Sequence, residues 1–236
     1  MREMFGSIAP RYDLITRIIS YGMDRRWKRE SVRDTPLPEG AVVLDLACGT
    51  GDISQMVLQR LPRARAISVD LTEEMLQLAR RRGLSEAVCA DATALPFADG
   101  SFDCVFIGYG LRNFPNLNSA LREIERVTRP GGRMVSLEFF LPANRVLRQI
   151  YLAYLYAWGA FWGLLLHGRP RTYTYIPDSL RSFISIEDFS SLLERMGYAD
   201  VNAQRRIFGG IGFHRAVKRK VAVPLQPAID TLLHRH

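Results

Sequence analysis

The residues with the clearest chemical meaning lie in 42–52, which read Val-Val-Leu-Asp-Leu-Ala-Cys-Gly-Thr-Gly-Asp. The apolar, β-branched start predicts a buried strand, and Gly49 and Gly51 predict a turn whose main-chain amides can approach a ligand closely. A dinucleotide-binding loop would have a third glycine where this chain has Ser54, and here the acidic residue Asp45 precedes the turn. A carboxylate beside a glycine turn suits a ligand with a cationic amino group and ribose hydroxyls, so we expect S-adenosylmethionine (SAM). A glycine-bearing turn in another α/β fold is the alternative.

Two more acidic residues follow predicted strands. Residues 64–70 predict a second strand that ends in Asp70, 19 positions after Gly51. A ribose-binding acid follows the glycine loop of nucleotide folds at about this spacing, so we expect Asp70 to bind ribose hydroxyls. Residues 86–90 predict a third strand, and the carboxylate of Asp91 with the amide of Ala92 suits an adenine edge. For any one acid, the alternative is a helix cap or a solvated turn.

The elements that must position these residues alternate along the chain. Further strands are predicted at 102–108 and 132–139, and helices near 52–61, 72–82 and 117–128. This order predicts an α/β fold with one doubly wound, Rossmann-like and mostly parallel sheet. We expect the final strand of this sheet to be antiparallel. Because ligands bind at the carboxyl ends of such strands, the following residues are expected to converge on one crevice: Asp45, Gly49, Asp70, Asp91 and Arg112.

Length and composition predict a single enzyme domain. The chain has 236 residues, of which 47% are hydrophobic, enough for a substantial core. We expect the domain to occupy 1–220, with helical caps at about 8–33 and 142–170, and 221–236 to form a tail. The three cysteines form no Cys-x-x-Cys pair, which favours reduced thiols and gives no support for a metal site. The start shows no secretion signal, so we expect a cytoplasmic protein.

A formal net charge of +8 and one charge-free run bear on the partners. We expect no nucleic-acid binding, because the chain has no basic stripe interleaved with aromatic residues on a readable motif. An anionic membrane surface is the expected partner, at the inner face of the membrane. Residues 150–166 carry no charge; we favour a helical cap that dips into the bilayer interface, with a buried or homodimer-forming helix and a spanning helix as alternatives.

Several motifs together resemble the ubiquinone/menaquinone biosynthesis C-methyltransferases over nearly the whole chain, to about residue 218. They are Asp-Leu-Ala-Cys-Gly-Thr-Gly-Asp at 45–52, Asp-Ala-x-x-Leu-Pro-Phe at 91–97, Gly-Leu-Arg-Asn at 110–113, Arg-Val-x-x-Pro-Gly-Gly-Arg at 126–133 and Leu-Glu-Phe at 137–139. The family's amino-terminal signature is matched at Phe5, Ile8-Ala9, Tyr12-Asp13, Ser20-x-Gly22 and Trp27-Lys28-Arg29, and its carboxyl-terminal one at 179–183 and 210–215.

The resemblance implies a cofactor site and exposes two departures. The expected SAM contacts are Asp45, Gly49, Thr50, Gly51, Asp70, Leu71, Asp91, Ala92 and Gly108. Gly108 stands where such proteins usually have a small polar residue, so one side-chain contact is missing or comes from the backbone. Thr16 stands where they usually have asparagine.

The implied activity is SAM-dependent C-methylation of a polyprenyl quinol ring in quinone biosynthesis. The expected catalytic residues are Arg112, Asn113 and Tyr109, with Arg112 stabilising a phenolate or holding a water that removes the proton. Tyr12, Asp13 and His214 are the expected substrate contacts. Two alternatives are a methyltransferase acting on another amphiphile, such as a phospholipid amine, and a non-catalytic SAM-binding partner in a quinone-synthesis assembly.

Overall fold

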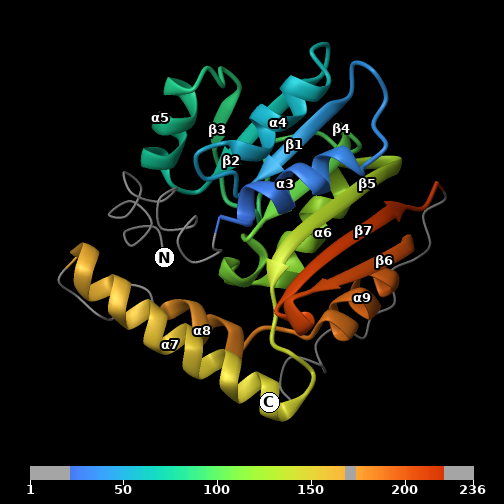
Figure 1. Ribbon diagram of the computed structural model, residues 1–236. Coiled ribbons are helices and arrows are strands. Elements are labelled where there is room, and N and C mark those ends of the chain that lie inside the picture. The colour runs from blue at the N-terminus through green and yellow to red at the C-terminus, as the bar shows by residue number, and fades with distance from the viewer. Residues whose placement is uncertain (1–21, 168–173, 221–236) are drawn as a thin grey trace.

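The computed structural model describes residues 22–167 and 174–220, and its centre is a seven-stranded sheet with the order β3-β2-β1-β4-β5-β7-β6 (Figure 1). Strands β1 to β5 are parallel, whereas β7 runs antiparallel to both β5 and β6. The predicted α/β sheet with an antiparallel final strand is therefore confirmed. The strands are β1 Val42–Leu46, β2 Arg65–Asp70, β3 Ala87–Cys89, β4 Phe102–Gly108, β5 Thr128–Phe139, β6 Tyr198–Arg206 and β7 Ile211–Lys218.

Helices cover both faces of this sheet and its lower edge (Figure 1). They are α3 Asp24–Arg33, α4 Asp52–Arg60, α5 Glu73–Arg81, α6 Leu117–Val127, α7 Arg145–His167, α8 Tyr175–Arg181 and α9 Ile186–Arg195, with 3₁₀ turns η2 Leu111–Asn113 and η4 Ile207–Gly209. The α6 helix begins where the Asn116 side chain accepts a hydrogen bond from the Ser119 amide at 2.9 Å.

Alternation along the strands sorts the core into two faces. Leu44 and Leu46 of β1 pack into the cluster that includes α6 and α9, whereas Val43 packs with residues of α3 and α4. Because successive side chains point to opposite faces, Asp45 lies on the α4 side of the sheet. The fold thus directs the first acid of the glycine motif toward a helix.

A third apolar cluster joins α7 and α8 to the carboxyl end of the sheet. In it Leu155 of α7 and Ile176 of α8 pack with Trp27, Tyr109 and Phe139. The long helix expected within 142–170 is present as α7. The α3 helix lies within the predicted opening cap at 8–33, and residues 8–21 of that cap lie outside the described residues. Within the described residues, no helix is both long and apolar enough to cross a membrane.

Candidate active site

A cavity lies at the carboxyl ends of β1, β2, β3 and β4, where the sequence predicted a crevice. It contains about 740 Å³ of empty space, part of it open to solvent. Its walls are Leu46, Ala47 and Gly49 after β1, Asp70, Leu71, Thr72 and Met75 after β2, Ala90, Asp91 and Ala92 after β3, and Gly108, Tyr109, Gly110, Asn113, Phe114 and Pro115 after β4. Four consecutive strand ends therefore supply one site, as is general for doubly wound sheets.

Asp70 connects two walls of the cavity. Its Oδ2 accepts a hydrogen bond from the Gly49 amide and its Oδ1 accepts one from the Thr72 amide, both at 2.9 Å. Burial raises the pKa of this carboxyl, while the two amides oppose that change. The glycine turn after β1 and the end of β2 are thus held together by one acidic side chain that also faces the ligand space.

Asp91 and Ala92 line the neighbouring wall. The Asp91 Oδ1 accepts hydrogen bonds from the Thr93 amide at 2.8 Å and the Thr93 hydroxyl at 2.7 Å, which closes a tight local turn. Ala92 is buried, whereas Asp91 is exposed. This wall therefore combines an accessible carboxylate with a fixed backbone.

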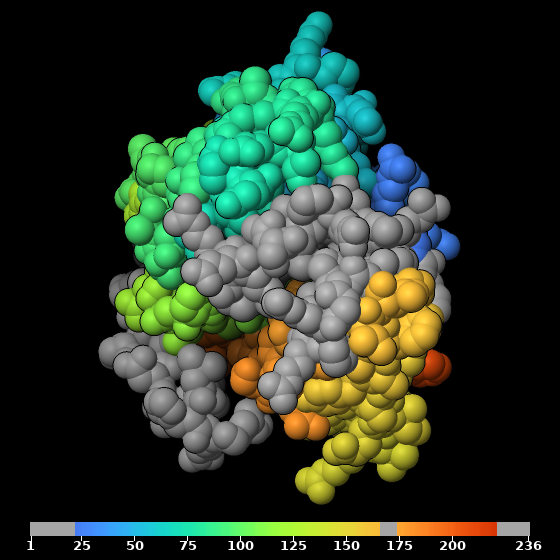
Figure 2. Space-filling model, turned by 90° about the vertical axis from the view of Figure 1, so that its left-hand side faces the viewer, coloured from blue at the N-terminus to red at the C-terminus, as the bar shows by residue number. Residues whose placement is uncertain are grey.

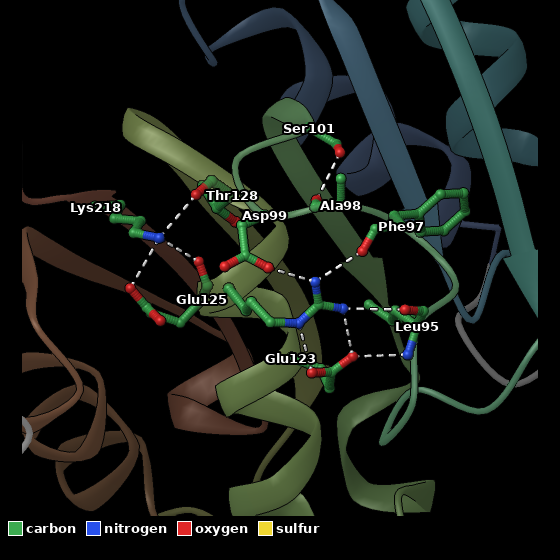
Figure 3. A network of polar contacts seen from close by, with 10 residues as sticks. Leu95, Phe97, Ala98, Asp99, Ser101, Glu123, Glu125, Thr128 and Lys218 are labelled. Atoms are coloured by element: carbon green, nitrogen blue, oxygen red, sulfur yellow. Dashed lines mark hydrogen bonds and ion pairs between the residues drawn. The ribbon is translucent and has the colours of Figure 1, made fainter.

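A network on α6 anchors the segment that follows this turn (Figure 3). The Arg126 guanidinium donates to the carbonyls of Leu95 at 3.0 Å and Phe97 at 2.7 Å, and to the Asp99 carboxylate at 2.7 Å. Glu123 accepts from the same guanidinium at 2.8 Å and from the Leu95 amide at 2.7 Å. These hydrogen bonds fix the conformation of the loop between β3 and β4 by tying it to α6.

Asp45 lies behind the glycine turn and does not line the cavity. Its Oδ2 accepts hydrogen bonds from the Ser54 amide at 2.9 Å and the Ser54 hydroxyl at 2.8 Å, and that hydroxyl lies 2.7 Å from the Ser68 hydroxyl. Since the N-cap Gly51 has no side chain, Asp45 supplies the acceptor at the start of α4. Ser54 occupies the position of the missing third glycine, and it donates both hydrogen bonds to the Asp45 carboxylate.

The buried position of Asp45 perturbs its ionisation. Burial raises the pKa of this carboxyl to about 7, against the Ser54 hydrogen bonds and the charge of Lys28. Its Oδ1 is buried and has no hydrogen-bond partner in the described part of the chain. Ser54 holds one carboxylate oxygen of Asp45 at the start of α4, and the expected contact between Asp45 and the cofactor stays a prediction.

Thr50 and Gly51 also lie outside the cavity lining. Gly51 has φ +83°, a conformation in which another residue is strained, and a Cβ there would lie 2.1 Å from Leu84 Cδ1 and force that side chain to move. Thr50 is buried, and its hydroxyl accepts a hydrogen bond from Arg82 at 3.0 Å; the same Arg82 nitrogen donates to Asp52 at 3.0 Å. These residues shape the turn from outside, whereas Gly49 reaches the cavity.

Lys28 ties α3 to the same turn. Its ammonium group lies 2.9 Å from Asp52 Oδ2 and 3.6 Å from Asp24 Oδ2, and its side chain is only 9% exposed. It also lies over the Tyr109 ring, 5.9 Å from the centroid. No role for the Trp-Lys-Arg motif at 27–29 could be inferred from the sequence. In the structure its lysine connects α3 to the start of α4 and to Tyr109 of the cavity.

The segment after β4 brings Tyr109 and Asn113 into the cavity. Tyr109 has φ +62° and its ring packs on Phe139, with centroids 4.8 Å apart. The Asn113 Nδ2 donates to the Tyr109 carbonyl at 3.2 Å, while its Oδ1 is buried with no hydrogen-bond partner among the described residues. A buried acceptor without a donor is costly, so this oxygen fits a site that a ligand or water completes.

Arg112 does not line the cavity and forms a buried ion pair. Its guanidinium pairs with Glu138, and the side chains of the two residues are 4% and 0% exposed. The same guanidinium packs 5.1 Å above the Phe139 ring and donates to the Tyr109 carbonyl at 3.2 Å. Glu138 also accepts from the Phe139 amide at 2.8 Å. Glu138 thus already pairs with the charge of Arg112, and the expected role of Arg112 on a phenolate stays a prediction.

A family model described as "ubiE/COQ5 methyltransferase family" matches residues 1–218. The chain belongs to this family. It is therefore a SAM-dependent methyltransferase by kinship, and the predicted resemblance and enzyme class are confirmed. Among the residues described, no group of three or more His, Cys, Asp or Glu side chains could hold a metal ion.

Other members and structures of the fold agree with this placement. The chain is 41% identical over 217 residues to a demethylmenaquinone methyltransferase of Thermus thermophilus, covering 89% of this chain and 98% of the relative. It is 38% identical to a ubiquinone/menaquinone biosynthesis C-methyltransferase of Geobacter sulfurreducens, covering 89% and 84%. A solved SAM-dependent methyltransferase from Thermotoga maritima has a TM-score of 0.67 at 19% identity, covering 93% of this chain and all of that one, and so shares the fold.

Of the substrate residues expected for this methyltransferase, the structure describes only His214, and His214 does not line the cavity. His214 lies on β7 under α9, 1% exposed, with its ring 4.8 Å from that of Phe189 and its Nε2 3.3 Å from the Ile186 carbonyl. Burial lowers its pKa to about 4, so it packs as a neutral ring away from the cavity. Tyr12 and Asp13 lie outside the described residues.

Several cavity residues were missed from the sequence. Thr72, Met75, Phe114 and Pro115 add mostly apolar surface, and each follows the end of a predicted strand within a few positions. That proximity was the available signal, but their ordinary residue types gave no reason to single them out.

Proposed function

We propose that this enzyme binds SAM in the cavity and methylates a ring carbon of a polyprenyl quinol. The family match over residues 1–218 carries the proposal, and the names of the two relatives describe the substrate class. The Thermus relative is named for demethylmenaquinone, which favours a naphthoquinol as the first substrate to test.

The polar groups of the cavity suit a nucleoside that carries a cationic group. We assign the ribose hydroxyls to Asp70 and the adenine edge to Asp91 and the Ala92 amide, because these lie at adjacent strand ends in one cavity. Asp45 supports the turn from behind through Ser54. Gly49, Leu71 and Gly108 also line the cavity, and we expect them to contact SAM closely. When bound, SAM supplies a sulfonium methyl group that is already electrophilic.

The chain's own task is to present a nucleophilic ring carbon and exclude water. Loss of the proton from a neighbouring ring hydroxyl makes that carbon electron-rich. We assign the hydroxyl to Asn113, whose buried Oδ1 can accept a hydrogen bond from it or from a water that takes the proton. Tyr109 and Phe114 provide aromatic walls for the ring. Arg112 then acts as a positioning residue for this segment.

The polyprenyl tail of such a substrate resides in a bilayer, so we also propose peripheral association with the cytoplasmic face of a membrane. This agrees with a chain of net charge +8. A homodimer stays open as an alternative use of the apolar helix α7.

One assay tests the activity. The protein is incubated with labelled SAM and a panel of reduced demethylquinones and phospholipids in detergent, and the methylated product is identified by mass spectrometry. We expect transfer to a quinol ring carbon. Transfer to a phospholipid instead, or SAM binding without transfer to any quinol, would overturn the proposal.

A variant pair tests the role of Asn113. Asn113→Ala is expected to lower kcat on the quinol on the order of a hundredfold, because the orientation of the hydroxyl and the route for its proton are lost. The matched control is Asn202→Ala on β6, an exposed asparagine far along the chain. Equal kcat values for the two variants would remove Asn113 from the mechanism.

A further inference from the structure

One face of α7 is exposed although it carries only apolar side chains. Val146, Ile150, Phe161 and Leu164 are 67%, 61%, 55% and 60% exposed, respectively. Exposed alanines at 153 and 157 complete the row, so the positions follow each other at intervals of three or four residues along one side of the helix. A continuous apolar stripe of this length on a protein surface marks an interaction site.

The opposite face of α7 packs into the domain next to the cavity. Leu152 and Leu155 are buried, and Leu155 belongs to the cluster that contains Tyr109 and Phe139. Figure 2 shows α7, in yellow, at the lower right of the molecule beside α8, in orange. The helix therefore stands between the cavity wall and the outside of the molecule.

A turn distant in the sequence extends the apolar surface. In η4, Ile207 is 43% exposed and Phe208 is 84% exposed, and both have positive φ, 48° and 53°. The turn lies against α7, because the Tyr151 hydroxyl donates to the Gly210 carbonyl at 3.4 Å. A strained backbone that holds a phenylalanine outward has no evident packing purpose within the domain.

Charge selects the partner for this surface. Between Glu138 and Asp178 the chain has four arginines and no acidic residue. Two of them, Arg145 and Arg148, lie in the first turn of α7, where the helix dipole disfavours cations. Because α7 itself contains no acidic residue, the same stripe in a second copy offers no carboxylate to these two arginines. An anionic lipid surface does so and also accepts the apolar stripe.

We propose that the apolar stripe of α7 and the η4 turn dock this enzyme on an anionic bilayer, with Phe208 inserted among the lipids. The proposal rests on the proposed function, since a membrane-resident quinol would then reach the cavity across the cluster beneath α7. The basic end of α7 contacts lipid phosphates, and the stripe lies in the interface plane rather than across the membrane.

Vesicle flotation with the full chain tests the docking. We expect binding to vesicles of phosphatidylglycerol and phosphatidylcholine that weakens with salt and with all-phosphatidylcholine vesicles. Phe161→Ser with Leu164→Ser should weaken partitioning on the order of tenfold or more, and Phe208→Ser on the order of tenfold. Arg145→Gln should weaken it about fivefold. The charge-matched control is Arg63→Gln, which replaces an exposed arginine just before β2, at the end of the strand away from the cavity. This control should leave partitioning unchanged.

Separate readouts distinguish this proposal from the activity itself. The serine variants should methylate a tail-less quinol in solution at the wild-type rate, yet lose activity on a long-tailed quinol in vesicles. Wild-type partitioning by these variants, or no vesicle binding by the wild type, overturns the docking surface. So does a wild-type dimer that the serine variants convert to monomer, since a second copy would then cover the stripe. Failure of every quinol assay with intact, variant-sensitive flotation overturns the proposed function alone.

Discussion

Replacing Asp45 with asparagine tests whether this buried carboxylate destabilises the folded protein at neutral pH. Asparagine keeps the shape and the acceptor for Ser54 but cannot ionise. The wild-type side chain is 1% exposed, and burial raises its pKa from its ordinary value near 3.8 to about 7. Lys28 and the Ser54 donors limit this rise without abolishing it.

The size and sign of the effect follow from linkage. Below about pH 4, Asp45 is protonated in both the folded and the unfolded state, so ionisation contributes no difference. Between about pH 4 and pH 7 only the unfolded chain releases the proton, so the wild-type free energy of unfolding falls as pH rises. A gap of about three pH units, at about 1.4 kcal/mol each, gives a loss of about 4 kcal/mol above pH 7.

Urea unfolding followed by tryptophan fluorescence measures this difference. Between pH 4 and pH 8 we expect the free energy of unfolding of Asp45→Asn, minus that of the wild type, to rise by about 4 kcal/mol and then become constant. Glu39→Gln, whose side chain is 70% exposed in the wild type, is the control and should leave the pH profile unchanged. Parallel profiles for Asp45→Asn and the wild type would refute the reasoning.

Three further substitutions probe the site. Arg112→Gln leaves the Glu138 charge buried alone and should lower the free energy of unfolding by about 3–5 kcal/mol in thermal or urea unfolding, whereas adding Glu138→Gln should restore most of it; a double variant as unstable as the single one contradicts the ion-pair account. Gly110→Ala places a Cβ 2.6 Å from that of Ala47 and should destabilise the protein by about 1–3 kcal/mol, so an unchanged Tm counts against the close approach. Asp70→Asn should raise KM for SAM at least tenfold with a smaller change in kcat, and an unchanged KM would exclude Asp70 from cofactor binding.

Much of the fold followed from local patterns. Alternating strands and helices, and apolar runs such as 42–46, predicted the parallel sheet. A strand that is buried on both faces is apolar at nearly every position, and this pattern is visible in the sequence. Helix bounds were within a few residues, and β5 begins earlier than expected, at Thr128 rather than near 132. The convergence of strand ends also followed, since it is a property of the topology.

The direction of individual side chains was not in the sequence. Asp45 and Asp70 both end predicted strands, yet alternation and the position of α4 send Asp45 to Ser54, while Asp70 reaches the cavity. Arg112 and Asn113 are adjacent in the sequence, but only Arg112 forms an ion pair with Glu138, which is distant in the chain.

The sequence by itself determined the fold class, the family and the edge of the sheet where the ligand site lies, because these depend on residue types and spacing. Only the tertiary structure decided which residues reach that site and which support it. It also separated the two faces of the charge-free helix: 150–166 is apolar throughout, and only packing against the sheet leaves one side bare beside Phe208. Contacts between residues distant in the sequence determine which face of α7 is buried, and a local sequence pattern does not reveal such contacts.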